Sequence, residues 1–486
     1  MATEYKVPTL AEPAPPKPNE VVLVTSGDLR HTANVPAWPM QQELEQQIAD
    51  VLAEVGYTVR RGHEYDPEYE HGFIWNQRMG MDVFASIHPD TPIIVAEAVW
   101  QYSHHVLSGL KTQRGPILTV ANWSGTWPGL VGLANLNASM TKAGMEYSTI
   151  WSVDFTDDWA RDAIKEWAQT GRITTHDTSH VRDLDASALP ADEAALGKAL
   201  AAELQRNGAV MGIFDEGCMG MYNAIFDDEY INPLGIFKER LSQSALYYRM
   251  TTVKDEEAEA VYQWLVDRGV TFDFGEEWEP ELTQDQVISQ CKMYIAALRI
   301  ADDFGCAGIG IQYQQGLKDL VPASDLAEGL LNEIDRPPAY TEDGRELYPG
   351  APLPHFNEVD WGCGVDALIT NRVWTAMNLN PSTSLHDVRW GDPYGDDFVW
   401  VMEISGSVPP SHLRGGYEGV VSERQAGMYF RLGGGTIKGV SKPGPVVYSR
   451  VFLMDGKLQV DMGIGEAIEL PDEETQRRWD ATTPVW

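Results

Sequence analysis

Short apolar runs alternate with helical repeats along the first part of the chain. The apolar runs have the length and composition of buried strands, and they cover residues 21–28, 57–61, 92–100 and 116–121. Between the first two, residues 40–56 carry apolar positions at helical spacing, and a glycine ends the repeat. Because strands that alternate with helices form an open parallel sheet, this pattern predicts an α/β fold.

The same alternation returns further along the chain. Helical repeats flank residues 210–223, which resemble a strand running into a glycine-rich turn, and a short strand at 307–312. The repeats cover residues 157–168, 191–206, 255–267 and 284–303. The pattern predicts a second α/β domain, whose last strand brings Gln312 to its carboxyl end, where loops often carry function.

From about residue 350 onward, strand-like runs separated by Gly and Pro replace the alternation. They cover residues 398–405, 427–432, 446–453 and 457–462. The glycine-rich residues 432–438 open no helix and predict a loop that another backbone or a ligand approaches closely. This part of the chain therefore predicts a β-rich, antiparallel or barrel-like C-terminal domain.

The length of the chain requires more than one core, because 486 residues exceed what a single domain usually contains. The predicted domains are residues 1–165, 166–350 and 351–486, the first of them with a Pro-rich arm over residues 1–19. The fold class predicted is thus α/β, with two Rossmann-like domains followed by a β-rich domain.

Composition excludes some classes of partner. The 36 basic and 72 acidic residues give a net charge of −36, which argues against binding to nucleic acid or to an anionic membrane. None of the four cysteines forms a CxxC pair, the N-terminus lacks the pattern of a signal peptide, and no apolar run approaches the ~20 residues of a membrane span. These features predict a soluble cytoplasmic protein.

The stretch from residue 308 to 366 carries the most suggestive chemistry. Glu328 lies in a helical repeat over 324–332, and Glu358 and Asp360 follow a turn-rich connection. Carboxylates brought together with few cations nearby repel unless a metal or a shared proton relieves them, and oxygen ligands suit a hard divalent ion. The alternative is a capped surface helix and a solvated acidic loop, since acidic pairs are common in so acidic a chain.

A second candidate is the turn after the strand at 116–121. Its sequence, NWSGTWPGLVGL over residues 122–133, offers polar side chains for sugar hydroxyls and two tryptophans for apolar sugar faces. The spacings GxGxxG and GxxxxGK[ST] are absent from the strand–helix turns, which disfavours a nucleotide cofactor. The alternative is a tight turn that only packs.

Four segments together resemble the L-fucose isomerase / L-arabinose isomerase superfamily, nearest its fucose-isomerase-like branch. They are PILTVANWSGTWPGLVGL, EGCMGMYNAI, the pair QYQQGLKDLVPASDLAEGLLN and FNEVD, and DVRW followed by FVWVMEISG. The resemblance covers residues 116 to about 406 and rests on the order and spacing of these motifs.

The resemblance implies two Rossmann-like α/β domains, a C-terminal β-rich domain and a homotrimer or homohexamer. It also implies a divalent ion, typically Mn2+ with Mg2+ as another candidate, and the interconversion of an aldose and a ketose through a cis-enediol. The substrate would be a sugar or a sugar derivative, with a proton moving between its C1 and C2.

Carried over by motif, Glu328 and Asp360 match the two carboxylate positions of the family and would be metal ligands, one or both of which also serve as acid and base. Asp366 is a rival for the second position, because WGCGVD intervenes where the family goes straight into a helix. Gln312 and Trp123 match positions near the substrate.

Three further residues belong to this expectation. Arg389, in the DVRW motif, is predicted to bind substrate. The family takes a third metal ligand from a histidine near its C-terminus, and the last histidine of this sequence is His412. His412 is therefore the predicted third ligand and His386 the other candidate, and a purely structural role is the alternative for both.

Two other functions compete with the isomerase interpretation. One keeps the scaffold and changes the reaction, to a lyase or decarboxylase that acts on a sugar acid through the same enediolate. The other is a non-catalytic sugar-binding protein, whose sign would be intact aromatic platforms without a metal.

Overall fold

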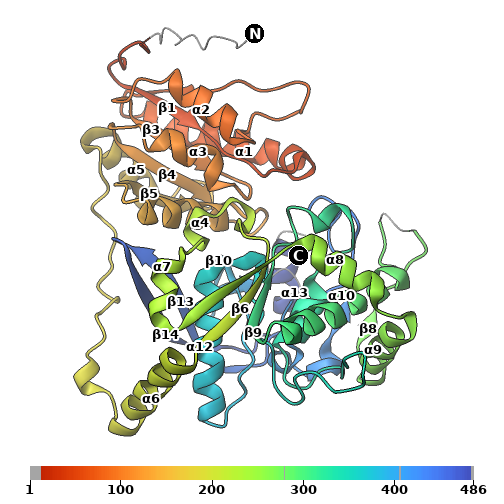
Figure 1. Ribbon diagram of the computed structural model, residues 1–486. Helices are drawn as coiled ribbons and strands as arrows, with labels where there is room; N and C mark the ends of the chain where they lie inside the picture. The colour runs from red at the N-terminus through yellow and green to blue at the C-terminus, as the bar shows by residue number, and fades with distance from the viewer. Residues whose placement is uncertain (1–11, 278–279, 404–406, 483–486) are drawn as a thin grey trace, which may run out of the picture. The chain divides into compact units, whose positions relative to one another are not determined.

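The structure is a computed structural model that describes residues 12–277, 280–403 and 407–482. It divides into two compact units, the first up to Trp123 with Trp127–Met140 and Met145–Asp177, and the second formed by Ser124–Thr126, Thr141–Gly144 and the chain from Thr178 on (Figure 1). The predicted Pro-rich arm lies outside the described residues as far as residue 11. The division into three domains stays a prediction.

The first unit is built on a five-stranded parallel sheet in the order β2-β1-β3-β4-β5. Its strands are β1 (Glu20–Val24), β2 (Thr58–Arg61), β3 (Ile93–Glu97), β4 (Ile117–Asn122) and β5 (Ser148–Ser152). The four predicted strands are confirmed. Strand β5 was missed, because this edge strand begins and ends with serine and lacks a continuous apolar run.

Helices cover this sheet and form its core. Helices α1 (His31–Ala53) and α5 (Asp158–Thr170) share one apolar cluster with β1, β3 and β4. Helices α2 (Gln77–Ala85) and α3 (Ser103–Leu110) pack so closely that a Cβ on Gly80 would lie 1.7 Å from the backbone oxygen of His105. Helix α4 (Gly129–Lys142) connects β4 to β5.

Helix α1 begins at His31 rather than at residue 40, where the prediction began it. The helix runs through Pro36 and Pro39, and prolines inside a helical repeat normally indicate a break because they remove a backbone donor. The aromatic side chain of Trp38, between the two prolines, is buried against Phe73 and Val99. Tertiary packing therefore outweighs the local cost of the two prolines.

The second unit contains a smaller parallel sheet in the order β7-β6-β9. Its strands are β6 (Ala209–Phe214), β7 (Ile236–Leu241) and β9 (Cys306–Ile311), and its helices are α6 (Ala191–Asn207), α7 (Asp228–Ile231), α8 (Gln243–Thr252), α9 (Asp255–Asp267) and α10 (Gln284–Asp303). The predicted strands and the helices predicted at 191–206, 255–267 and 284–303 are confirmed. The helix predicted at 157–168 is α5 of the first unit, and β7, α7 and α8 were not predicted. The fold is therefore mixed α/β, with a parallel sheet and flanking helices.

The glycine-rich residues 432–438 form the predicted loop of close backbone approach. Gly434 has a φ of 116°, and a Cβ there would lie 2.8 Å from the backbone nitrogen of Ala323. Gln290 of α10 donates to the carbonyl oxygens of Ala323 and Gly435, which ties this loop to the segment before Glu328.

The strand predicted at 427–432 is wrong, because these residues form turns. Tyr429 and Phe430 are neighbours in sequence and both are buried, whereas a strand would send them to opposite faces. Phe430 lies against Tyr313, with ring centroids 5.8 Å apart. The apolar pattern that predicted a strand here thus comes from aromatic side chains that are buried in turns.

In the C-terminal part of the second unit, the longer strands pair in an antiparallel arrangement. Strand β10 (Asp387–Tyr394) pairs with β11 (Asp397–Glu403), and β13 (Gly444–Met454) pairs with β14 (Lys457–Ala467). The remaining elements are β8 (Thr271–Phe272), α11 (Asp325–Asn332), α12 (Trp361–Ala376), β12 (Val421–Ser422) and α13 (Asp472–Ala481). The antiparallel character was predicted correctly, and the barrel stays a prediction.

None of the helices in the described part of the chain combines the length and the apolar content that a membrane crossing requires. The cytoplasmic location stays a prediction.

Candidate active site

Two strained turns meet at the carboxyl end of the second sheet. Asp215 and Met219 follow β6 with φ of 62° and 39°, and Glu358 and Val359 precede α12 with φ of 56° and 60°. The two turns contact each other. Left-handed backbone is costly for residues other than glycine, most of all for a β-branched valine, and such strain clusters at functional sites. No sequence pattern indicated it.

The segment before Glu358 extends the second sheet. The backbone nitrogen of Ile309 in β9 donates to Pro354 at 2.9 Å, and the nitrogen of Phe356 donates back to Ile309 at 3.0 Å. His355 therefore pairs with β9 as a parallel bridge. This pairing carries Glu358 to the same edge of the sheet at which β9 ends with Gln312.

Helix α11 is buried along its whole length, so the alternative of a surface helix is wrong. Glu328, in the middle of the helix, is only 4% exposed. Ser324 adopts a helical backbone conformation and does not cap the helix. Its hydroxyl instead donates to Oε1 of Glu328 at 2.5 Å, one helical turn away.

A pair of hydrogen bonds fixes α11 to the segment that carries Glu358. The side chain of Asn332 donates to the carbonyl oxygen of His355 at 3.1 Å and accepts from its backbone nitrogen at 2.8 Å. Glu328 stands one turn before Asn332 and so shares its face of the helix. As a result, Oε2 of Glu328 lies 3.8 Å from Nδ1 of His355.

Burial shifts the pKa of both Glu328 and His355. It raises the pKa of Glu328 well above its usual value, and the charges of Asp325 and Glu358 raise it further, against the hydrogen bond from Ser324. Burial also lowers the pKa of His355 to about 3. The 3.8 Å contact therefore joins a neutral imidazole to a carboxyl that holds its proton more tightly than an ordinary glutamate.

Both ring nitrogens of His355 are buried, and among the described residues no hydrogen bond of normal geometry reaches them, although the side chain of Asn357 is near enough to raise the pKa of the ring against burial. The amide nitrogen of Gln312 is in the same situation, while its Oε1 accepts from the backbone nitrogen of Gln315 at 3.1 Å. Buried polar atoms are normally satisfied, so each of these atoms, just after β9 or on the segment that pairs with it, is available to a polar ligand.

Asp360 is engaged elsewhere. Its Oδ1 caps α12 by accepting from the backbone nitrogens of Gly362 at 2.9 Å and Cys363 at 3.2 Å. Its Oδ2 accepts from Arg450 at 2.8 Å in an ion pair. Of the carboxylates in this turn, Glu358 is the one whose charge raises the pKa of Glu328. The role of Asp360 as a metal ligand stays a prediction.

Asp366 lies further along α12, where it accepts from the hydroxyls of Thr370 at 3.2 Å and Ser449 at 2.9 Å. Arg389 is buried on β10, with Nε 3.7 Å from Oε2 of Glu403. Burial raises the pKa of Glu403 to about 7, which the charge of Arg389 opposes. These residues belong to the second unit, but their described contacts do not include Glu328.

His412 belongs to a different cluster of the second unit. Its Nε2 lies 3.1 Å from the carbonyl oxygen of Ser382, and burial lowers its pKa against the charge of Glu333. His386 is half-buried beside it, and desolvation lowers its pKa to about 4. In the described contacts neither histidine touches Glu328, so their role as ligands stays a prediction. Trp123 directly follows β4 in the first unit.

The residues that sequence reasoning left without a role are His355 and, as partner of Glu328, Glu358. The signal that could have found them is HFNE at 355–358, which puts an imidazole and a carboxylate three residues apart after a Pro-rich connection. That signal is weak on its own, because it does not say that both residues face Glu328.

The donor set suits a divalent cation. Within the described ranges, no three His, Cys, Asp or Glu side chains already stand in the arrangement of a metal site. The charge of Glu358 nevertheless makes it harder for Glu328 to lose its proton, and His355 offers ring nitrogens without a hydrogen-bond partner beside Glu328. Carboxylate oxygens and an imidazole are donors that Mn2+ accepts, and a dication would keep both carboxylates ionised.

Comparison with known proteins adds no relative to this picture. No protein-family model matches the chain, and a search of curated proteins finds no match.

Proposed function

We propose that this protein is a metal-dependent aldose–ketose isomerase whose acid–base residue is Glu328. The observation that carries the proposal is a buried carboxyl with a raised pKa, 3.8 Å from a neutral, unpartnered imidazole. Isomerisation through a cis-enediol needs one group that takes a proton from C2 and returns it to C1. A carboxyl whose pKa is raised above its ordinary value is a stronger base than an ordinary carboxylate and still a proton donor, so it serves in both directions.

In the proposed reaction, ionised Glu328 takes the proton from C2 of the aldose and gives it to C1. A hydroxyl proton moves from O2 to O1, so the ketose has the same atoms and electrons as the aldose. The hydroxyl of Ser324 holds Oε1, which leaves Oε2 on the side of His355 for the transfer. The free amide of Gln312 would donate to a sugar oxygen.

The metal would bind to Glu328 and Glu358, with His355 as the third donor. A bound Mn2+ or Mg2+ would stabilise the negative charge that develops on the enediolate. Asp360, the second carboxylate that the family resemblance suggests, would then act by holding the turn through its cap and its pair with Arg450.

The decisive assay is metal analysis of the purified protein followed by incubation with pentoses, hexoses and sugar acids. Interconversion of an aldose and its ketose supports the proposal. Release of water or carbon dioxide from a sugar acid would replace it by the lyase alternative. Binding without turnover in the presence of Mn2+ and Mg2+ would leave a sugar-binding protein.

Mn2+ is expected to raise the melting temperature more at pH 8 than at pH 5.5. The reason is that binding must remove the proton of Glu328, whose pKa is raised in the folded protein. Glu358→Gln should weaken Mn2+ binding at least tenfold, measured by calorimetric titration, because it removes a ligand and one charge. Asp360→Asn is the matched control and should retain binding. The opposite result would make Asp360 the ligand.

The proposal includes a homo-oligomer, trimer or hexamer, and the ribbon of β13 and β14 supports it. The inner part of the ribbon is buried against α12 through Val451 and Leu453. Its outer part extends beyond α12 (Figure 1), and there Val447, Met462 and Ile464 are 51%, 63% and 81% exposed. The strand register puts these three side chains on one face. Exposed apolar patches of this kind usually mark an interface.

Replacing both Met462 and Ile464 with serine is expected to yield a monomer. The change removes the most exposed apolar side chains of the ribbon and leaves its buried half intact. Multi-angle light scattering of the wild type and the variant measures the effect. Asp461→Ser, on the opposite face of the same strand, should keep the wild-type mass. An unchanged mass in the double variant would place the interface elsewhere.

A further inference from the structure

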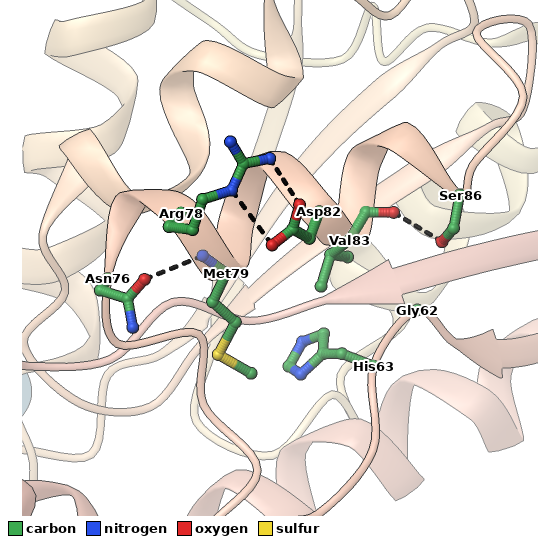
Figure 2. A pocket seen from close by; sticks show the side chains of 8 residues that line it. All are labelled: Gly62, His63, Asn76, Arg78, Met79, Asp82, Val83 and Ser86. Carbon is green, nitrogen blue, oxygen red and sulfur yellow. Dashed lines mark hydrogen bonds and ion pairs between the residues drawn. The ribbon is translucent and has the colours of Figure 1, made fainter. Parts of the chain in front are cut away.

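The first unit contains a pocket of about 530 Å³ at the carboxyl end of β2, beside α2 (Figure 2). The pocket is shallow and opens widely to solvent, and its volume is in the range of small-molecule sites, roughly 300–1,000 Å³. Gly62 begins the wall just after β2, where a Cβ would come within 2.9 Å of Val24. The pocket shares no residue with the candidate active site.

His63, which lines this pocket, carries a hydrogen-bond donor without an acceptor. The side chain is 7% exposed, and its Nε2 accepts from the backbone nitrogen of Thr25 at 3.2 Å. Burial lowers the pKa of His63 well below its usual value, so the ring is neutral and its one proton sits on Nδ1. In the described part of the chain, Nδ1 is buried and has no partner. Such a donor favours any ligand that brings it an acceptor.

The other polar groups of the pocket form a mixed set without net charge. Arg78 pairs with Asp82, through Nη2 to Oδ1 at 2.5 Å and Nε to Oδ2 at 3.1 Å. Asn76 uses its side-chain oxygen to cap α2 and turns its amide nitrogen away from the cap (Figure 2). The hydroxyl of Ser86 donates to the carbonyl of Val83 at 2.7 Å and keeps its lone pairs.

We propose that this pocket binds a neutral polyhydroxylated molecule, a sugar or polyol, one oxygen of which accepts from Nδ1 of His63. Each hydroxyl both donates and accepts, which suits the mixed groups at the rim. Met79 and Val83 give an apolar wall for the C–H face of the ligand. Met79 is flexible enough to admit the ligand to the imidazole edge.

The balance of charge at the pocket narrows the class of ligand. The charge of Arg78 is balanced by Asp82 at the pocket, and the whole chain carries −36, so an anion gains little here. The site is independent of the isomerase proposal.

The test uses the full chain with ¹³C-labelled methionine methyl groups. Met79 lines the pocket, and Met81 on the same helix is 40% exposed and lies outside the lining. Xylitol, an uncharged polyol without a carbonyl group, is the probe, because it cannot be isomerised. We expect a saturable shift of the Met79 methyl signal and none of Met81. The same titration on Glu328→Gln should give the same result, which separates this site from the active site.

Two variants locate the binding. Ser86 is exposed, and Ser86→Trp fills the pocket from its rim without touching the core, so it should weaken xylitol binding at least tenfold. His63→Phe removes the donor and should weaken it about tenfold, the factor of one ordinary hydrogen bond. His88→Phe, a histidine outside the pocket, should leave it unchanged.

Three results would overturn the proposal. They are a Met79 signal that does not move, a shift that only the charged sugar acid xylonate produces, and a shift that Ser86→Trp leaves intact. Because Ser86→Trp alone decides the location, failure of His63→Phe to fold does not leave the question open.

Discussion

Glu328→Gln is expected to lower kcat for sugar isomerisation by about 10²–10⁴-fold, the usual contribution of a positioned acid or base. Glutamine preserves the size of the side chain and its acceptor for Ser324 but cannot exchange the proton. Initial rates on the best substrate, with the melting temperature of both proteins, measure the effect. Glu333→Gln, just past the end of the same helix, is the matched control and should retain activity. A Glu328→Gln variant with full turnover would remove Glu328 from the mechanism.

The same substitution has a pH signature in stability. The folded protein raises the pKa of Glu328 above the ordinary 4.5, so it binds this proton more tightly than the unfolded chain does. The stability that results is fully present below about pH 4.5 and is lost as the pH rises through the folded pKa. Without metal, Glu328→Gln should therefore gain stability relative to the wild type between pH 4 and pH 8. Urea unfolding at the two pH values checks the sign, and a relative loss would contradict the raised pKa.

Phe356→Ala is expected to lower the free energy of unfolding by about 3–5 kcal/mol, the range for deleting a buried aromatic ring. Phe356 is 1% exposed and lies between β9 and α12. A Cβ on Gly310 or Gly364 would come within 2.7 or 2.9 Å of its ring, so both elements have a glycine where the ring fits. The ring also meets Trp361, with centroids 5.3 Å apart.

Chemical denaturation of the Phe356 variants measures this prediction. Phe356→Leu keeps most of the volume and should cost about 1.5 kcal/mol or less. Activity should fall with the alanine variant as well, because Phe356 is next to His355 and anchors the turn that bears Glu358. A loss below about 1 kcal/mol for alanine would mean that the neighbouring glycines allow the site to collapse around the cavity.

The parallel sheets and most helices could be predicted from sequence, because burial on both faces leaves apolar runs and helix packing leaves a helical period. The helix that carries Glu328 was predicted, but its burial was not. Its polar residues find partners inside the protein, as Asn332 does with His355. In the sequence pattern such residues appear only as a polar face of the helix, which predicts that this face is exposed to solvent.

The chemistry of the site depended on contacts that local patterns do not contain. Asp360 looked like a ligand by motif, yet its carboxylate meets Arg450, 90 residues away in sequence. Glu358 was visible as an acidic residue, but its position depends on a left-handed turn in which neither Glu358 nor Val359 is glycine. Propensity would not place a valine there, because the strain is sustained by surrounding packing.

The long-range ties around α11 also set an order of events during synthesis. The sheet and core of the first unit are complete once α5 has been made, at Thr170, so this unit can fold while the rest of the chain is still being made. Helix α10 must instead wait for Gly435, 145 residues beyond Gln290, and the core beside α12 waits for Leu453. Closing such long loops is slow, and the unfinished second unit displays apolar surface meanwhile. We therefore expect the nascent chain to need chaperone protection most after the first unit has folded and before Leu453 has been made.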